Sequence, residues 1–336
     1  MRRLETPLRA AIICFLAISA ITLYGCSENQ RSVDINQEQA VSLYVDAMML
    51  NELSEWDNAI QKLDEATELD PEFAMAYSLK GDIYQKQENF EKSADAYDIA
   101  TSLDPWSFKD FLGLGKVCQI MKSFLRAANA YVRACQLAPE HPAAHLGAGR
   151  CYYELEEYEQ AFEYGTKAIQ LDPNSGECEL LMGDIYQIRK DHSRAIAAYR
   201  RALEIEGNKP KIMVALAKAY LRSQRYDAAK ELLLSAIELD SQDNIAWQYL
   251  GFAYLKLHEI DDAIASYQEA VRIDRGDWMG HKALGVAFML KAMKDRDNYD
   301  ALRAKALEQW NLSLEIKPDQ TKLIKFVEKY SYTAGN

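Results

Sequence analysis

Two glycine-containing segments have the residue types that bind phosphate in nucleotide-binding proteins. They span residues 113–116 (GLGK) and 147–150 (GAGR). A phosphate-binding loop needs a complete Walker A or dinucleotide pattern that follows a strand and opens a helix, and neither segment meets that requirement. Their glycines also fall at regularly spaced positions that suit close packing between helices. We therefore interpret both segments as structural.

The five histidines are the next candidates, because histidine binds metals and transfers protons. His141 and His145 lie four residues apart, but Pro142 between them opposes one continuous helix that would present both to a metal. The sequence contains no HExxH motif, no acidic third ligand at suitable spacing and no GxSxG nucleophile element. It thus predicts no catalytic residue, metal site or cofactor.

The charged residues and the cysteines argue against two further classes of site. The 336 residues include 51 Asp and Glu against 39 Lys and Arg, and the formal charge of −12 opposes nucleic-acid binding. The six cysteines include no CxxC pair, so neither a zinc ribbon nor a c-type haem site is indicated. Cys118, Cys135, Cys151 and Cys178 are expected to pack within helices, with Cys135 and Cys151 as the first pair to test for a disulfide.

The elements that would position any site repeat every 34 residues. Pro71, Pro105, Pro139 and Pro173 share this spacing, and each marks a helix end because proline cannot continue a helix. Small residues recur twice in each unit, where two helices would approach closely. The first set is Ala47, Gly81, Gly115, Gly149, Gly183, Ala217, Gly251 and Gly285, and the second is Ala66, Ala100, Ala134, Ala168, Ala202, Ala236 and Ala270. A fixed period of paired helices predicts an array of helical hairpins.

This pattern resembles the tetratricopeptide repeat family over residues 40–318. The resemblance implies an all-α, right-handed α-solenoid of about eight helical hairpins, followed by a capping helix and tail at residues 319–336. The eighth repeat is nine residues longer than the others, with the surplus near residues 291–300 (KAMKDRDNYD). Insertions in solenoids map to loops on one face, so we expect this segment to form a projecting loop.

The resemblance also implies that positions 2, 5, 9, 12 and 13 of each first helix face a concave groove. In this sequence they give a mixed apolar and cationic set: Tyr44, Met48, Leu112, Lys116, Ile120, Leu146, Arg150, Tyr153, Leu180, Ile188, Lys218, Leu221, Arg222, Phe252, Leu255 and Met289. Exposed apolar surface marks interaction sites, although some of these residues can instead pack one repeat against the next. The set suits a peptide or partner helix with apolar anchors and acidic residues.

Residues 1–25 stand apart from the repeats and have the character of a signal peptide. Three arginines precede an apolar run over residues 10–24, which has the length of a secretory core rather than of a spanning helix. Residues 23–26 (LYGC) resemble a bacterial lipobox, which implies lipidation of Cys26, and Ser27 after it implies export to the outer membrane. The polar residues 26–39 are expected to form a tether. The alternative is an ordinary signal peptide or an uncleaved anchor.

Together these features predict a non-enzymatic protein-interaction scaffold on the bacterial cell envelope, held by lipid and facing the periplasm. The partner is a protein or peptide, and the system it supports is a pilus, secretion or polysaccharide-export assembly by family analogy. The alternative is a regulatory or substrate-recruiting subunit of an envelope enzyme complex.

Overall fold

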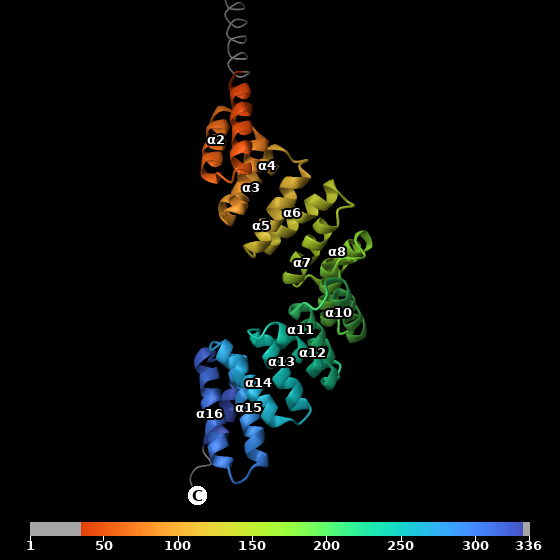
Figure 1. Cartoon of the computed structure of the whole chain (residues 1–336), viewed down its shortest axis with the longest axis vertical. Coiled ribbons are helices and arrows are strands. Elements are labelled where there is room, and N and C mark those ends of the chain that lie inside the picture. Colours follow the sequence, from red (N-terminus) through yellow and green to blue (C-terminus); the bar gives the residue numbers. More distant parts are fainter. Residues whose placement is uncertain (1–34, 332–336) are drawn as a thin grey trace, which may run out of the picture. The chain divides into compact units, whose positions relative to one another are not determined.

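The computed structural model describes residues 35–331, which are helical almost throughout and contain no strand (Figure 1). Cys26 and the predicted signal peptide lie outside the described residues. The first described helix covers residues 35–52 and therefore includes residues 35–39, which the sequence analysis places in the polar tether. Gln37, Glu38 and Gln39 have good helix propensity, and they continue the helix ahead of the buried Ala40.

The described residues divide into two compact units, 35–161 and 162–331, and the boundary falls within α8. Hairpin 1 consists of the helix of residues 35–52 and α2, and hairpins 2 to 8 are the successive pairs from α3–α4 to α15–α16. In the first unit the helices are α2 (Trp56–Leu69), α3 (Ala74–Lys86), α4 (Phe90–Leu103), α5 (Phe108–Ile120), α6 (Phe124–Leu137) and α7 (Pro142–Glu154), followed by α8 (Tyr158–Leu171). In the second they are α9 (Gly176–Ile188), α10 (His192–Glu206), α11 (Pro210–Arg222), α12 (Tyr226–Leu239), α13 (Asn244–Lys256), α14 (Ile260–Ile273), α15 (Trp278–Lys294), α16 (Tyr299–Ile316) and α17 (Thr321–Ser331). The predicted all-α repeat array with a C-terminal helix is confirmed.

Hairpins 1 to 7 each turn at a residue with left-handed backbone geometry. The residues at these turns have φ between 59° and 64° and recur every 34 positions: Ser54, Glu88, Lys122, Glu156, Lys190, Gln224 and His258. The helices that follow two of these turns begin with a side-chain cap: Asn89 Oδ1 accepts from the Lys92 amide, and Asp191 Oδ1 from the Arg194 amide. Local turn geometry therefore sets the antiparallel path of each pair.

The small residues of the repeat make room for aromatic rings. A Cβ added at Gly81 or Gly113 would lie 2.7 Å from the ring of Tyr97, and one at Gly183 would lie 2.4 Å from Tyr199. These distances are too short for any side chain, so the glycines let the helices close on a buried tyrosine. Gly115 and Gly147 meet Tyr131 in the same way, which confirms that the two glycine segments are structural.

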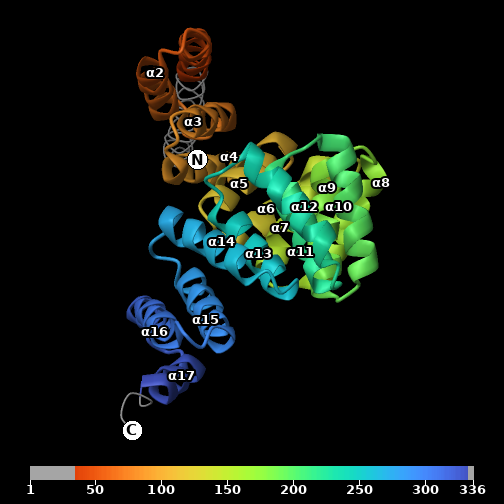
Figure 2. The ribbon, with the colours of Figure 1, turned by 60° about the horizontal axis from the view of Figure 1, so that its bottom comes forward.

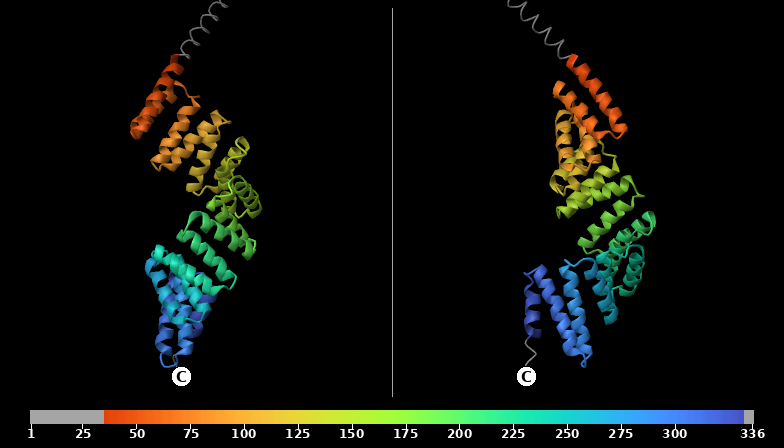
Figure 3. Two further views of the ribbon diagram at one scale, coloured as in Figure 1. Left: turned by 45° about the vertical axis from the view of Figure 1, so that its right-hand side comes forward. Right: turned by 60° about the vertical axis from the view of Figure 1, so that its left-hand side comes forward.

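The predicted loop at residues 291–300 is wrong. Helix α15 has 17 residues where α13 has 13, and α16 has 18 where α14 has 14. The extra residues thus lengthen both helices and add one residue to their connection. Figure 3 shows this last hairpin in blue, near the C-terminus. The segment continues as helix because residues 291–294 (KAMK) and 301–307 (ALRAKAL) have high helix propensity.

Helix α17 packs against α16 after the last hairpin (Figure 2). Leu323 is buried in the same apolar cluster as Trp310, and the rings of Phe326 and Tyr330 lie 6.1 and 6.0 Å from the Trp310 ring. Before this helix, the Gln320 amide donates to the Ser313 and Lys317 carbonyl oxygens. The inner side of the C-terminal helix is therefore anchored by apolar and polar contacts, while Ile324 and Phe326 remain 39% and 50% exposed.

Candidate functional site

A cavity of about 400 Å³ opens between the first helices of hairpins 6, 7 and 8. Its lining comes from α11, α13 and α15, with one tyrosine from α14: Lys218, Leu221, Arg222, Gln248, Tyr249, Phe252, Tyr267, Met279 and Ala283. All of these helices belong to the second unit. We call this space the α11–α13–α15 cavity.

The cavity combines an apolar floor with a cationic rim. Phe252 is 39% exposed and Met279 is 52% exposed, which is high for large apolar side chains. Lys218 and Arg222 lie one helical turn apart on α11, and neither has an ion-pair partner within residues 35–331. No carboxylate belongs to the lining that the described chain provides. The surface therefore suits a ligand with both apolar and acidic groups.

Tyr267 differs from the tyrosines at the same repeat position. The Tyr97 and Tyr199 hydroxyls each donate to an aspartate at 2.6 Å, Asp82 and Asp184 respectively. The Tyr131 hydroxyl donates to Gln119 at 2.9 Å. The Tyr267 hydroxyl has no partner among the described residues, because Phe252 occupies the position of Asp82 and Leu255 the position of Gln119. Burial raises the pKa of Tyr267, so its hydroxyl remains a donor at neutral pH.

The equivalent position in the first unit, between hairpins 2 and 3, is closed by polar contacts. Lys109 Nζ lies 2.5 Å from Asp82 Oδ2, and Ser78 donates to the buried Asp110 at 2.5 Å. Asp82 also accepts from Tyr97. Each of these groups is already paired within the chain, so this surface has few unpaired polar groups that could bind a ligand.

The structure brings four predicted groove residues to one cavity: Lys218, Leu221, Arg222 and Phe252. The others lie on their own first helices. In the first unit these are Tyr44 and Met48 on the helix of residues 35–52, Leu112, Lys116 and Ile120 on α5, and Leu146, Arg150 and Tyr153 on α7; in the second they are Leu180 and Ile188 on α9, Leu255 on α13 and Met289 on α15.

Accessibility divides these predicted residues. Met48 and Ile120 are about half exposed, and Lys116 is exposed, as a binding surface requires. Leu146, Leu221 and Met289 are buried, with 9%, 6% and 4% of their surface exposed. Their apolar side chains pack between repeats, so little of each can reach a partner. For these three residues, packing between repeats is therefore a better description than partner binding.

Sequence reasoning missed Gln248, Tyr249, Tyr267, Met279 and Ala283 in the cavity lining. Gln248 and Met279 occupy groove positions 5 and 2, so the same register identifies them. Tyr267 lies at a packing position. In the sequence, the presence of Phe252 where another repeat has an aspartate indicates that the Tyr267 hydroxyl lacks an internal acceptor.

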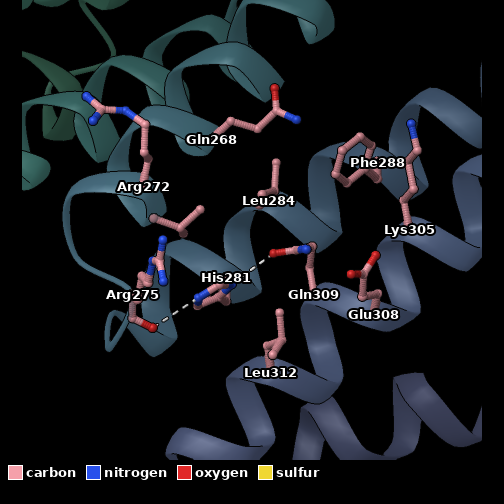
Figure 4. A pocket seen from close by; sticks show the side chains of 11 residues that line it. Gln268, Arg272, Arg275, His281, Leu284, Phe288, Lys305, Glu308, Gln309 and Leu312 are labelled. Carbon is pink, nitrogen blue, oxygen red and sulfur yellow. Dashed lines mark hydrogen bonds between the residues drawn. The ribbon is translucent and has the colours of Figure 1, made fainter.

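A second cavity, of about 530 Å³, lies between α14, α15 and α16 (Figure 4). His281 is held on both ring nitrogens, with Nδ1 2.8 Å from Gln309 Oε1 and Nε2 3.2 Å from the Arg275 carbonyl oxygen. Cavities at the same repeat positions occur along α10–α12 and α8–α10. This space is thus a recurring gap between hairpins, and its central histidine is already bonded.

Metal and redox chemistry have little support in the described region. Within residues 35–331 no three histidine, cysteine or acidic side chains are grouped to hold a metal ion. His141 precedes α7 while His145 lies within it, as the intervening proline predicts. Cys118, Cys135, Cys151 and Cys178 are buried and are not joined to one another by a disulfide, and burial raises the pKa of Cys135 to about 11 and of Cys151 to about 12. Such thiols are poor nucleophiles near neutral pH.

Five family models match the chain, four described as tetratricopeptide repeat and one as TPR repeat. They cover residues 48–88, 74–105, 123–176, 188–251 and 245–277. No curated protein matches the chain significantly. In the described chain, no helix is sufficiently long and apolar to span a membrane.

Several solved structures share the fold at low sequence identity. The crystal structure of the APC/C hetero-tetramer Cut9-Hcn1 gives a TM-score of 0.61 at 17% identity, over 86% of this chain and 55% of that one, so the chain spans about half of its length. A tetratricopeptide repeat protein from Parabacteroides merdae gives 0.58 at 14% identity, over 74% and 99% of the two chains. The pilF protein of Pseudomonas aeruginosa gives 0.52 at 18% identity, over 64% and 97%. These likenesses concern the fold alone.

Proposed function

Because this chain is a tetratricopeptide repeat protein, whose family generally serves as a protein–protein interaction scaffold, we propose that it is a non-enzymatic adaptor on the bacterial cell envelope. The adaptor binds a protein segment in the α11–α13–α15 cavity. The observation that carries this proposal is the cavity itself, where half-exposed apolar side chains adjoin unpaired cations. Such a combination is costly to leave in water unless a partner covers it.

The envelope location rests on the sequence of the leader. Residues 23–26 (LYGC) follow an apolar run of secretory length, and lipidation of Cys26 would hold the repeats at a membrane surface. Each buried CH₂ of an acyl chain contributes about 0.8 kcal/mol, so several chains give firm anchoring. We expect Cys26→Ala to abolish incorporation of radiolabelled palmitate, and unchanged labelling of that variant would refute the anchor.

The role in assembly of a pilus, secretion or polysaccharide-export complex extends this proposal by family analogy. An adaptor of this kind collects one component of an assembly near the membrane and presents it to the next. The repeats account for residues 35–316 and α17 covers the last hairpin, so the described chain is devoted to helix-hairpin surfaces.

Affinity capture from detergent-solubilised envelope tests the binding site with a matched pair of variants. Phe252 and Leu234 are both 39% exposed in the second unit, but only Phe252 lines the cavity. Phe252→Asp should abolish capture of the partner, while Leu234→Asp should retain it. Truncation of a central anchor commonly weakens binding by about 2 kcal/mol or more. Equal capture by the two variants, both folded by circular dichroism, would place the binding site elsewhere.

A further inference from the structure

The α11–α13–α15 cavity offers a hydrogen-bond donor whose counterparts in hairpins 2, 3 and 5 are satisfied internally. We propose that it selects an extended acidic segment, in which an apolar side chain enters over Phe252 and Met279 and an adjacent carboxylate accepts from the Tyr267 hydroxyl. This inference rests on the proposed function, because it names the chemistry of the partner at the same site. Tyr267 is then a specificity-determining residue for the ligand.

The charge pattern of the surrounding face supports an acidic partner. Positions 2, 5, 9, 12 and 13 of α11, α13 and α15 carry five cations and no acid, although the chain has a formal charge of −12. The cations are Lys211, Lys218, Arg222, Lys256 and Lys282. A local field of this sign within an acidic molecule attracts carboxylates and repels basic segments.

The carboxylate that caps the start of α15 is already committed to internal hydrogen bonds. Asp277 is 6% exposed, accepts from the Gln248 amide at 2.5 Å and caps α15 through the Met279 amide at 3.1 Å. It therefore fixes Gln248 and the start of α15 rather than neutralising the rim cations.

The position of Tyr267 explains why an acceptor is needed as well as an apolar anchor. Its ring packs against Gly251, as the ring of Tyr97 packs against Gly81, so the hydroxyl is held in place by the helix pair. A donor that loses water without gaining an acceptor weakens binding. A purely apolar ligand in the cavity would leave the Tyr267 hydroxyl in that state, whereas a flanking Asp or Glu would satisfy it.

A peptide selection on the full chain tests the inference directly. A random dodecapeptide library is panned over the immobilised protein, and enriched peptides are then measured by fluorescence polarisation. We expect them to combine an aromatic or large aliphatic residue with Asp or Glu within two positions. Tyr267→Phe should weaken their binding about tenfold, which is the loss of one charge-assisted hydrogen bond. Tyr199→Phe is the matched control, because its hydroxyl is bonded to Asp184.

A double variant should block the cavity with the same residue types that hairpins 2 and 3 use. Phe252→Asp with Met279→Lys places at hairpins 7 and 8 the residue types that Asp82 and Lys109 provide at hairpins 2 and 3. The new aspartate gives Tyr267 an internal acceptor, so this variant should fold and lose peptide binding.

The outcomes separate this inference from the proposed function. Two outcomes overturn the inference and leave the groove function intact. In the first, the peptides lose binding to the double variant but carry no acidic residue. In the second, they bind Tyr267→Phe and Tyr199→Phe with equal affinity. Peptides that bind the double variant unchanged, or a selection that enriches none, count against both.

Discussion

Hairpins 2 and 3 and hairpins 7 and 8 show how one backbone framework yields two opposite surfaces. In both, a glycine of the first helix closes on a tyrosine of the second, Gly81 on Tyr97 and Gly251 on Tyr267. Asp82 and Lys109 then satisfy the first tyrosine and each other. In hairpins 7 and 8, Phe252 stands at the position of Asp82 and Met279 at the position of Lys109. Neither side chain is charged, and a cavity lies beside them. Binding capacity here depends on which side chains stay unpaired rather than on a change of fold.

The shared framework predicts the largest effect. Gly81→Leu and Gly251→Leu should each cost about 3 kcal/mol of unfolding free energy, since a Cβ at either position already lies within 2.9 Å of a tyrosine ring. Urea unfolding followed by circular dichroism measures both losses. If only one variant is destabilised, the two regions do not share a framework and the comparison fails.

The acceptor in the first region predicts the next effect. Asp82→Ala removes the partner of both Tyr97 and Lys109, and should cost about 1.5–3 kcal/mol because a buried donor loses a charged acceptor. Phe252→Ala at the equivalent position should cost less, since Phe252 is partly exposed and its side chain forms no hydrogen bond, although Lys256 Nζ lies 5.3 Å from its ring centroid. A larger loss for Phe252→Ala in the same urea titration would show that Phe252 serves mainly in packing.

Paired tyrosine-to-phenylalanine changes sharpen the comparison at single atoms. Tyr97→Phe and Tyr199→Phe should each lose about 1.5 kcal/mol, the low end of the range for one hydrogen bond to a charged group. Tyr267→Phe should change the unfolding free energy by roughly zero, because its hydroxyl has no partner in the described chain. A loss for Tyr267→Phe equal to that of Tyr97→Phe would mean that an acceptor already satisfies Tyr267.

The smallest expected effect concerns exposed charge. Lys109 is 63% exposed beside Asp82, so Lys109→Met should cost only about 0.2–1 kcal/mol at low salt and less at high salt, where screening weakens the pair. Lys218→Met should cost nothing at either salt concentration, since Lys218 has no ion-pair partner among residues 35–331. If both variants are less stable than the parent chain, and raising the salt concentration reduces the loss in neither, this assignment is wrong.

The 34-residue period made the fold predictable, because each packing position carries its own constraint. Gly81, Gly115 and Gly183 are small where a tyrosine ring approaches, and this requirement is visible in one sequence. The extra residues of the last hairpin were misassigned to a loop because an insertion can equally extend two helices. Length alone does not distinguish these outcomes, whereas the helix propensity of residues 291–294 favours extension.

The candidate site was only partly predictable, since it depends on pairs of residues that lie about one repeat apart. Lys218, Leu221, Arg222 and Phe252 were identified by helix position alone. Whether such a position is open depends on its neighbours: Asp82 is closed by Lys109, which follows it by 27 residues in the chain. The sequence of a single repeat therefore does not show that Tyr267 lacks the aspartate acceptor that Tyr97 has.

Helix α17 has a consequence for self-association. A repeat array ends on a helix whose outer face would accept another hairpin, and identical copies could stack there end to end. Here Leu323, Phe326 and Tyr330 occupy that face around Trp310, and Gln320 ties the segment to the carbonyl oxygens of α16. The helix thus covers the outer face of the last described hairpin, so copies gathered at high local density on a surface would not stack through that face of α16.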